Sequence, residues 1–324
     1  MAKILRIFAL LAIAGGAFSS STRADDYPSR PITLVVPFPA GGAADTVARL
    51  MAPRLERRLG QTVVIDNKPG ATGIIGTQYV ARATPDGYTL VIASSGSHGA
   101  LPNVHRSLPF DPIKDFTPMG FGASFPLVLV VPATIAPKTL KEFIDDAKTA
   151  KKELTYGTSG PGGTLHIAGE MFRLATGIPT LHVPFRGETP ALVEVMANRV
   201  AMAFPAAGGA VGQVKGGNLR ALAVTGSKRL PILPDVPTMG EAGMPSFEIA
   251  VWYGIAGPAG VPAAITAKIS EAIKQAVQEP ELVRLLQEQG GETSPMGPDE
   301  FSAYISRQIE KIGRVTKSAN ISLD

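Results

Sequence analysis

Cysteine is absent from this sequence of 324 residues, and aromatic residues are scarce at 6%. Without cysteine the chain can form no disulfide, thiolate metal site, iron–sulfur cluster or cysteine nucleophile. Charged residues make up only 18% of the chain against 45% hydrophobic residues, which is typical of a folded globular protein. Glycine (35) and proline (28) are abundant, which predicts many tight turns between short elements.

Hydrophobic runs long enough to span a membrane are also missing, and the N-terminus carries only a short apolar stretch. Lys3 and Arg6 precede an apolar stretch over residues 7–18, and small residues then lead to Ala24. This stretch is shorter than the ~18–20 residues that span a bilayer, so we expect residues 1–24 to be a cleaved export signal rather than an anchor. No later run approaches that length, so we expect the rest of the chain not to be embedded in a membrane.

The formal net charge of +4 depends on that same segment. Without Lys3, Arg6 and Arg23 the chain keeps 28 of its 31 basic residues against 27 acidic ones, which is close to neutral. The charge therefore gives no reason to expect a nucleic-acid partner.

Strand-like and helix-like patterns alternate along the rest of the chain. Apolar runs at residues 32–36 and 62–65 predict strands, and between them lies a helical stripe with Asp45 as its expected N-cap. Thr139 begins a capping box before another helix, and the alternation starts again after residue 154. Such alternation predicts parallel sheets flanked by helices, and two sets of elements predict an α/β protein with two lobes.

Two glycine-rich loops carry the strongest chemical signal. Residues 38–45 read FPAGGAAD and residues 157–164 read GTSGPGGT, and each stretch joins a predicted strand to a predicted helix. Backbone N–H groups are free at such a junction and the helix N-terminus carries partial positive charge, so a carboxylate or phosphate can bind there without an arginine. One loop alone would favour simple turn formation. With two loops, turn formation and an anion-binding cleft explain the pattern equally well.

The usual signatures of catalysis are missing. The sequence has no Gly-x-Ser-x-Gly or Walker A motif, neither loop reads Gly-x-Gly-x-x-Gly, and the four histidines have no metal-ligand spacing. Ser159 and His166 could act as nucleophile and base, but the sequence places no acidic residue to orient the histidine. We therefore expect no catalysis, no metal and no cofactor. For His98 and His166, which lie near serine- and glycine-rich stretches, polar contact with a ligand and a structural role both stay open.

A series of short stretches occurs in order along the chain after the signal. They include VVPFPAGG at 35–42, NKPGA at 67–71, PDGYTL at 85–90, LPFD at 108–111, HVPFRG at 182–187, LPDVPT at 233–238 and AGPAG at 256–260. Each stretch alone is weakly specific, but together the series resembles the Bug-type solute-binding proteins of tripartite tricarboxylate transporters, the TctC-like receptors. The resemblance covers essentially the whole chain after the signal.

This resemblance implies a type II periplasmic binding protein fold, in which two α/β lobes close on a small carboxylate. It implies that lobe 1 is discontinuous (residues 25–125 plus 248–324) and that residues 126–247 form lobe 2. It also implies that the two glycine-rich loops clamp the carboxylate through amides, hydroxyls and waters. The ligand-binding residues expected on this basis are Phe38, Ala40, Gly41, Gly42, Ala43, Ala44, Asp45, Ser95, His98, Ser159, Gly163, Thr164, His166, Arg186 and Gly187.

Some positions depart from the family pattern. Pro205 stands where family members often carry a small polar or acidic residue that faces the ligand, and Phe185 and Arg186 replace the more usual Tyr-Lys. These departures predict an altered distal pocket, so a citrate-like ligand is not assumed.

The expected function is that of a periplasmic solute-binding protein that captures a small carboxylate. By the resemblance, its partners are the integral-membrane permease subunits of a tripartite tricarboxylate-type transporter. Two alternatives stay open: an orphan binding protein that reports its ligand to a sensor, and a hydrolase or transferase that uses Ser159 and His166.

Overall fold

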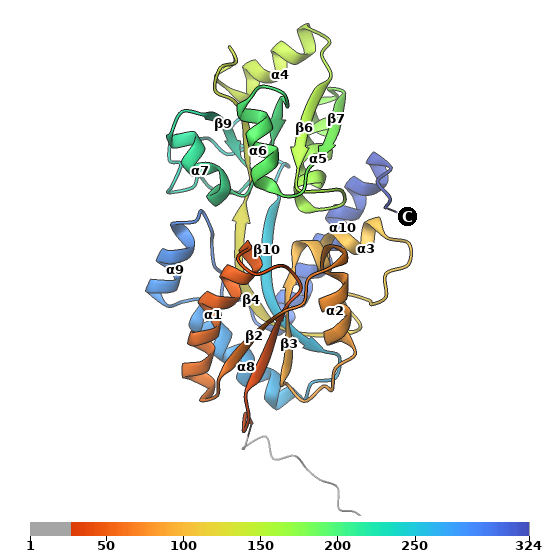
Figure 1. Ribbon diagram of the computed structural model, residues 1–324, viewed down its shortest axis with the longest axis vertical. Helices are drawn as coiled ribbons and strands as arrows, with labels where there is room; N and C mark the ends of the chain where they lie inside the picture. Colours follow the sequence, from red (N-terminus) through yellow and green to blue (C-terminus); the bar gives the residue numbers. More distant parts are fainter. Residues whose placement is uncertain (1–26, 324) are drawn as a thin grey trace, which may run out of the picture.

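The computed structural model describes residues 27–323, so the predicted export signal at residues 1–24 lies outside the described residues. The described chain forms two five-stranded sheets, one in each half of an elongated molecule, with helices packed around each (Figure 1). This arrangement confirms the predicted α/β protein with two lobes. Within residues 27–323, no helix is long and apolar enough to cross a membrane.

The first sheet has the strand order β2-β1-β3-β10-β4. Its strands are β1 (Ile32–Val36), β2 (Val63–Asn67), β3 (Thr89–Ser94), β4 (Phe116–Pro126) and β10 (Ala250–Pro258). β1 runs parallel to β2 and β3, whereas β10 runs antiparallel to both β3 and β4.

The second sheet has the strand order β7-β6-β8-β5-β9. Its strands are β5 (Val128–Pro132), β6 (Leu154–Thr158), β7 (Thr180–Pro184), β8 (Met202–Ala203) and β9 (Leu219–Val224). β6 runs parallel to β7 and β8, whereas β5 runs antiparallel to β8 and β9.

The prediction of parallel sheets is therefore wrong for β5 and β10. The chain passes from the first sheet to the second at Leu127, between β4 and β5, and it returns to the first sheet at β10. β5 and β10 each begin at the junction between the lobes and run away from it, because each follows a crossing. β1 and β6, which precede the glycine-rich loops, run toward the junction and end at it. β5 and β10 are therefore antiparallel to the strands beside them.

Ten α-helices of the described chain surround the sheets, with a short 3-10 helix at Ala71–Gly73 and a π-helix at Ser95–Ala100. They are α1 (Ala43–Leu59), α2 (Ile74–Ala81), α3 (Leu101–Val104), α4 (Leu140–Thr149), α5 (Thr164–Thr176), α6 (Glu188–Met196), α7 (Ala207–Lys215), α8 (Ala263–Ala276), α9 (Pro280–Gln287) and α10 (Pro298–Ala319). The N-cap predicted at Thr139 is confirmed, because its hydroxyl accepts a hydrogen bond from the Glu142 amide at 3.2 Å at the start of α4. The reciprocal bond of a capping box is replaced, because Glu142 Oε2 accepts from the Lys138 amide at 2.7 Å instead.

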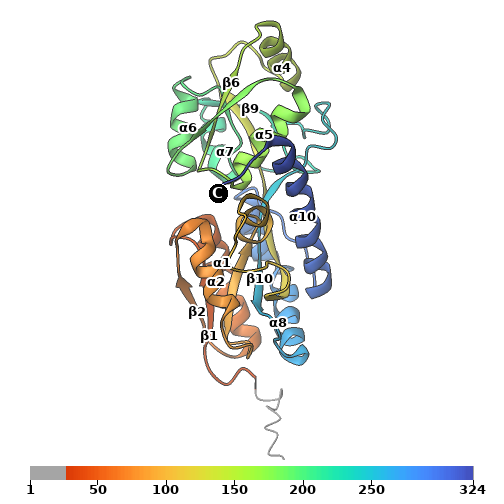
Figure 2. The same cartoon turned by 90° about the vertical axis from the view of Figure 1, so that its right-hand side faces the viewer.

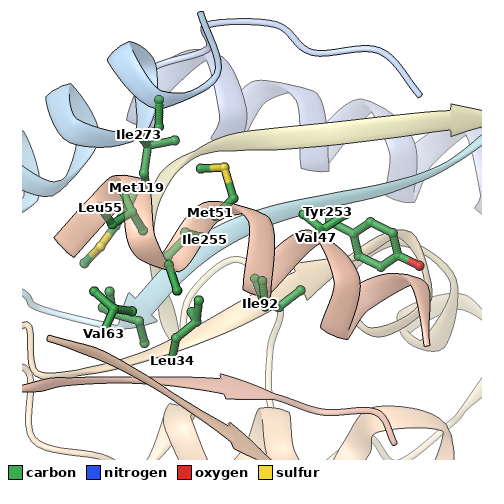
Figure 3. Close-up of a cluster of buried hydrophobic side chains, with 14 of the residues drawn as sticks. Leu34, Val47, Met51, Leu55, Val63, Ile92, Met119, Tyr253, Ile255 and Ile273 are labelled. Carbon is green, nitrogen blue, oxygen red and sulfur yellow. The ribbon is translucent and has the colours of Figure 1, made fainter. Parts of the chain in front are cut away.

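Each lobe has its own apolar core. In the first lobe, Met51 of α1 and Ile273 of α8 are fully buried over the sheet residues Leu34 and Ile255 (Figure 3). Burial of side chains of this size contributes roughly 1.5–3 kcal/mol each. This core holds α1 firmly against β1, and it thereby fixes the loop that joins them.

The last helix, α10, connects the two lobes physically. It packs against β4 of the first lobe and α5 of the second, and it runs alongside both in Figure 2. Ile312, near its C-terminal end, is buried in the core of the second lobe. After α10, the Leu323 amide donates a hydrogen bond of 2.8 Å to the Val104 carbonyl.

Candidate functional site

A cavity of about 600 Å³ lies between the two sheets. Its walls come from the loop after β1, the end of β3, β10, the loop after β6, and the first turns of α5, α6 and α7. Both glycine-rich loops therefore face the same space. In open α/β sheets the crevice at the carboxyl ends of the strands is the usual ligand site.

The two loops end in the same backbone conformation. Gly42 caps α1 with φ −79° and ψ 171°, and Gly163 caps α5 with φ −78° and ψ 172°. Each cap follows a left-handed glycine, Gly41 (φ 81°) or Gly162 (φ 75°), a conformation that other residues rarely adopt. Neither helix has a side-chain cap. The first-turn amides, which have no acceptor within their helix, are therefore directed at the cavity.

In the first loop, the Asp45 carboxylate fixes this geometry. It accepts hydrogen bonds from the Gly41 amide (2.9 Å), Arg49 Nε (2.8 Å) and Asn67 Nδ2 (3.0 Å). These bonds, that from Arg49 foremost, lower the pKa of Asp45 to about 2. The predicted N-cap role is wrong, because α1 begins two residues before Asp45 and this side chain reaches back to the loop from the first turn.

In the second loop, His166 occupies the equivalent position. Its Nδ1 accepts a hydrogen bond of 2.9 Å from the Gly162 amide, so this nitrogen carries no proton. The ring stacks on His182, with centroids 4.0 Å apart, and His182 Nε2 lies 2.6 Å from Thr158 Oγ1. Burial lowers the pKa of both histidines, that of His182 to about 4, and this keeps the stacked pair uncharged at neutral pH.

A direct hydrogen bond joins the two sides of the cavity. Ser95, directly after β3, and Thr164, the first residue of α5, have their hydroxyl oxygens 3.0 Å apart. Both residues are buried and both line the cavity. The uncapped helix ends therefore have two hydroxyl groups beside them.

The charged residues that line the cavity are all acidic. Among the described residues, those that line the cavity include no lysine, arginine or histidine, but they do include Glu188 and Glu288. Burial raises the pKa of Glu188 to about 7, although the Ala206 amide donates a hydrogen bond of 3.1 Å to it. Donor groups for an anion therefore come from the backbone and hydroxyls, not from cationic side chains.

About half of the residues predicted to bind ligand line the cavity. They are Phe38, Gly42, Ala43, Ser95, Ser159, Gly163 and Thr164. Ala40, Gly41 and Ala44 instead line a neighbouring hollow on the same loop. Asp45 and His166 support the loops from behind.

His98, Arg186 and Gly187 are not among the residues that line the cavity. His98 is fully buried against Phe116, with ring centroids 4.7 Å apart, and its Nδ1 is hydrogen-bonded to Ser97 Oγ at 2.9 Å. Burial lowers its pKa to about 3. Arg186 is exposed, and Gly187 is the N-cap of α6 with φ 129°.

Several lining residues escaped the sequence analysis, chiefly Glu188, Thr189 and Tyr253. They lie on segments far apart in the chain, and they meet only because the fold brings the segment after β7 and the strand β10 to one junction. Glu188 alone had a usable signal, because it is an acidic residue that follows a predicted strand and begins a helix.

Two mixed sheets flanked by helices, with a cavity between them that uncapped helix ends face, define a two-lobed solute-binding protein of the periplasmic type. The chain belongs to the tripartite tricarboxylate transporter family of receptors, TctC, which it matches over residues 47–321. This result confirms the resemblance seen in the sequence.

Solved structures agree with this assignment. A protein of R. palustris determined with adipate is 35% identical, with a TM-score of 0.82 over 92% of this chain and 99% of that chain. The periplasmic binding protein BugD is 32% identical, with a TM-score of 0.78 over 91% and 99%. MatC of Rhodopseudomonas palustris, determined with malate, is 32% identical, with a TM-score of 0.77 over 89% and 99%. These similar chains are binding proteins, and they share the two-lobed fold described above.

Proposed function

We propose that this protein binds a small carboxylate between the N-termini of α1 and α5 and delivers it to a transporter. The observation that carries the proposal is the pair of uncapped helix ends, Gly42 and Gly163, on opposite sides of one cavity. A carboxylate placed there would accept first-turn amide hydrogen bonds from both lobes. Ser95, Ser159 and Thr164 would add hydroxyl donors.

The relatives support a ligand of modest size. Malate and adipate, the compounds found in two similar structures, have four and six carbons. Micromolar binding requires about 8 kcal/mol. Four or five charge-assisted hydrogen bonds of roughly 1.5–3 kcal/mol each supply this before ordering costs.

The remaining assignments follow from family membership. We propose that residues 1–24 direct export and are removed near Ala24, that the protein acts in the periplasm, and that it delivers its ligand to integral-membrane permease subunits. We further propose that residues 25–125 with 248–324, and residues 126–247, close on the ligand as two lobes. A neighbouring permease gene would favour transport over a sensor role.

We propose that binding occurs without turnover. His166 Nδ1 accepts from the Gly162 amide, and no hydrogen bond in the described part of the chain joins Ser159 to His166. A nucleophile needs its base within hydrogen-bond reach. A ligand that is consumed by the purified protein, but not by Ser159→Ala, would contradict this.

A thermal-shift screen tests the proposed function. Ligand at about 100 times its dissociation constant adds roughly 2.7 kcal/mol, enough to raise the melting temperature by several degrees. We expect a shift with small carboxylates and none with neutral or purely cationic compounds. Mass spectrometry of the denatured protein's supernatant identifies any ligand that copurifies. No shift, with no copurified carboxylate, would contradict the proposal.

A further inference from the structure

Two more helices begin at the same cavity, and one protein carboxylate already lies between them. Glu188 is the first residue of α6, and Ala206 is the N-cap of α7. The Ala206 amide donates to Glu188 Oε2 at 3.1 Å. The N-terminus of α7, a natural position for a second ligand anion, is therefore occupied by the protein's own acid.

Glycine in the first turn of α7 leaves room for this carboxyl group. A Cβ added at Gly209 would collide with Glu188 Oε1, and one at Gly208 would lie 2.7 Å from the Gln289 carbonyl oxygen. Gly209 thus leaves the space that the Glu188 side chain fills, whereas Gly208 allows α7 to approach the Gln289 backbone. Tyr253 also lines the cavity, and burial first and the Glu188 carboxylate second raise the pKa of its hydroxyl.

Nothing in the lining offsets this negative charge. Of the titratable groups that line the cavity, Glu288 is already paired with Arg284 at 2.6 Å and half-exposed, and Tyr253 is neutral. Among the described residues, the lining contains no cationic side chain. The cavity thus has donor amides at α1 and α5, and an acceptor carboxylate at α6.

We propose that Glu188 makes this cavity select a carboxylate that also carries an N–H donor, an ammonium or a carboxamide group, and reject dicarboxylates. The inference rests on the proposed function, since the ligand's carboxylate is bound by α1 and α5. The proposed ligand preference would distinguish this chain from the relatives solved with malate and adipate, which are both dicarboxylates.

The physical reason is electrostatic. A second ligand carboxylate near Glu188 would place two negative charges in one poorly solvated space, which is strongly unfavourable unless one is protonated. An ammonium or amide N–H would instead donate to Glu188 and restore the solvation that burial removes. Burial raises the pKa of Glu188 to about 7, so a donated N–H would stabilise the charged form that burial disfavours.

Isothermal titration calorimetry with matched ligands tests this. The probes are succinate, its monoamide and 4-aminobutanoate, and adipate, its monoamide and 6-aminohexanoate, all at pH 8. In the unmodified protein we expect the better monoamide or amino acid to bind at least about tenfold more tightly than the diacid of its series.

Glu188→Gln keeps an acceptor for the Ala206 amide but removes the charge. We expect it to lose this preference or reverse it. Glu194→Gln is the matched control, because Glu194 lies on the same helix, pairs with Arg199 and does not line the cavity. The control should keep the preference of the unmodified protein.

The outcomes distinguish a failure of the Glu188 inference from a failure of the proposed function. A preference for diacids in the unmodified protein, or a monoamide or amino-acid preference that persists in Glu188→Gln, would overturn the inference while the proposed function stands. Binding of none of the six probes, with no shift in the carboxylate screen and no copurified carboxylate, would overturn the proposed function together with the inference. The ligand comparison on the unmodified protein does not depend on whether the variant folds.

Discussion

The two glycine-rich loops share one backbone design but are held in place by different chemistry. In both, the third residue of the following helix accepts a hydrogen bond from the amide of the left-handed glycine. In the first loop that residue is Asp45, a charged carboxylate with three donors. In the second it is His166, a neutral imidazole that stacks on His182.

This difference shows that the backbone geometry, rather than any side chain, is what the two halves of the site have in common. A charged acceptor holds the first loop at every pH above about 2, where Asp45 is ionised. The second loop keeps its shape only while His166 Nδ1 is unprotonated. The clamp is thus predicted to be robust on one side and pH-sensitive on the other.

The largest expected effect comes from filling both caps with the same side chain. An added Cβ would meet only the Pro39 carbonyl at 3.4 Å at Gly42 and nothing within 4 Å at Gly163, and both residues have ordinary extended backbones. Gly42→Val and Gly163→Val should therefore fold, but they should block ligand approach to the amides. We expect each to weaken carboxylate binding by roughly 100-fold or more, measured by calorimetry.

The control for these variants is thermal stability, which should change little in either. Loss of binding in one variant with unchanged affinity in the other would show that a single loop holds the ligand, and the comparison between the loops would then fail.

The second effect concerns the two supporting residues. Asp45→Asn removes the charge that three donors share, and we expect the free energy of unfolding to fall by about 2 kcal/mol. His166→Gln replaces a neutral acceptor, and we expect the free energy of unfolding to fall by about 1 kcal/mol. Urea denaturation at pH 7.5 measures both. Equal losses would contradict the distinction between a charged and a neutral support.

Acidification should destabilise the protein through its buried histidines, of which His166 and His182 support the second loop and His98 lies in the first lobe. The pKa values of His166, His182 (about 4) and His98 (about 3) are lowered, so the unfolded chain takes up protons first as the pH falls below 6.5. Each of these histidines then lowers the free energy of unfolding by up to about 1.4 kcal/mol per pH unit. Glu188, with its raised pKa, acts in the opposite direction.

We therefore expect the free energy of unfolding to drop by about 2 kcal/mol between pH 6.5 and 5. Urea denaturation at the two pH values measures this, and His166→Gln should show a smaller drop. A constant stability over this range would argue against buried neutral histidines.

The smallest effect concerns the hydroxyl bridge between Ser95 and Thr164. Thr164→Ala removes one partner of a 3.0 Å hydrogen bond and a ligand donor, and we expect carboxylate affinity to fall by roughly 0.5–2 kcal/mol. Thr164→Ser keeps the hydroxyl and should stay near the unmodified value. If the serine variant loses as much as the alanine variant, the methyl group matters rather than the hydroxyl.

The sequence predicted the local features well, because strand, loop and helix patterns are local. The two-lobed fold is confirmed, and the strand–loop–helix junctions at 38–45 and 157–164 were predicted and occur in the structure. The strand directions of β5 and β10 depend on where the chain crosses between lobes, which no local pattern records.

The cavity itself was only half predictable. Its glycine-rich half comes from two continuous stretches, whereas Glu188, Tyr253 and Gly209 are brought together by tertiary structure alone. Asp45 was wrongly predicted as the N-cap of α1, since an acid near the start of a helical pattern fits either the N-cap or the first turn.

The central claim is that one carboxylate is bound by the first-turn amides of both α1 and α5. Amide NMR of the 15N-labelled protein tests this most directly, with saturation by whichever of the six probe compounds binds most tightly in calorimetry. We predict that the amide protons of the first turns, at Ala43 and Thr164 above all, move downfield together as hydrogen bonds to the carboxylate form. Shifts confined to one helix end, or centred on residues outside the cavity, would contradict the account.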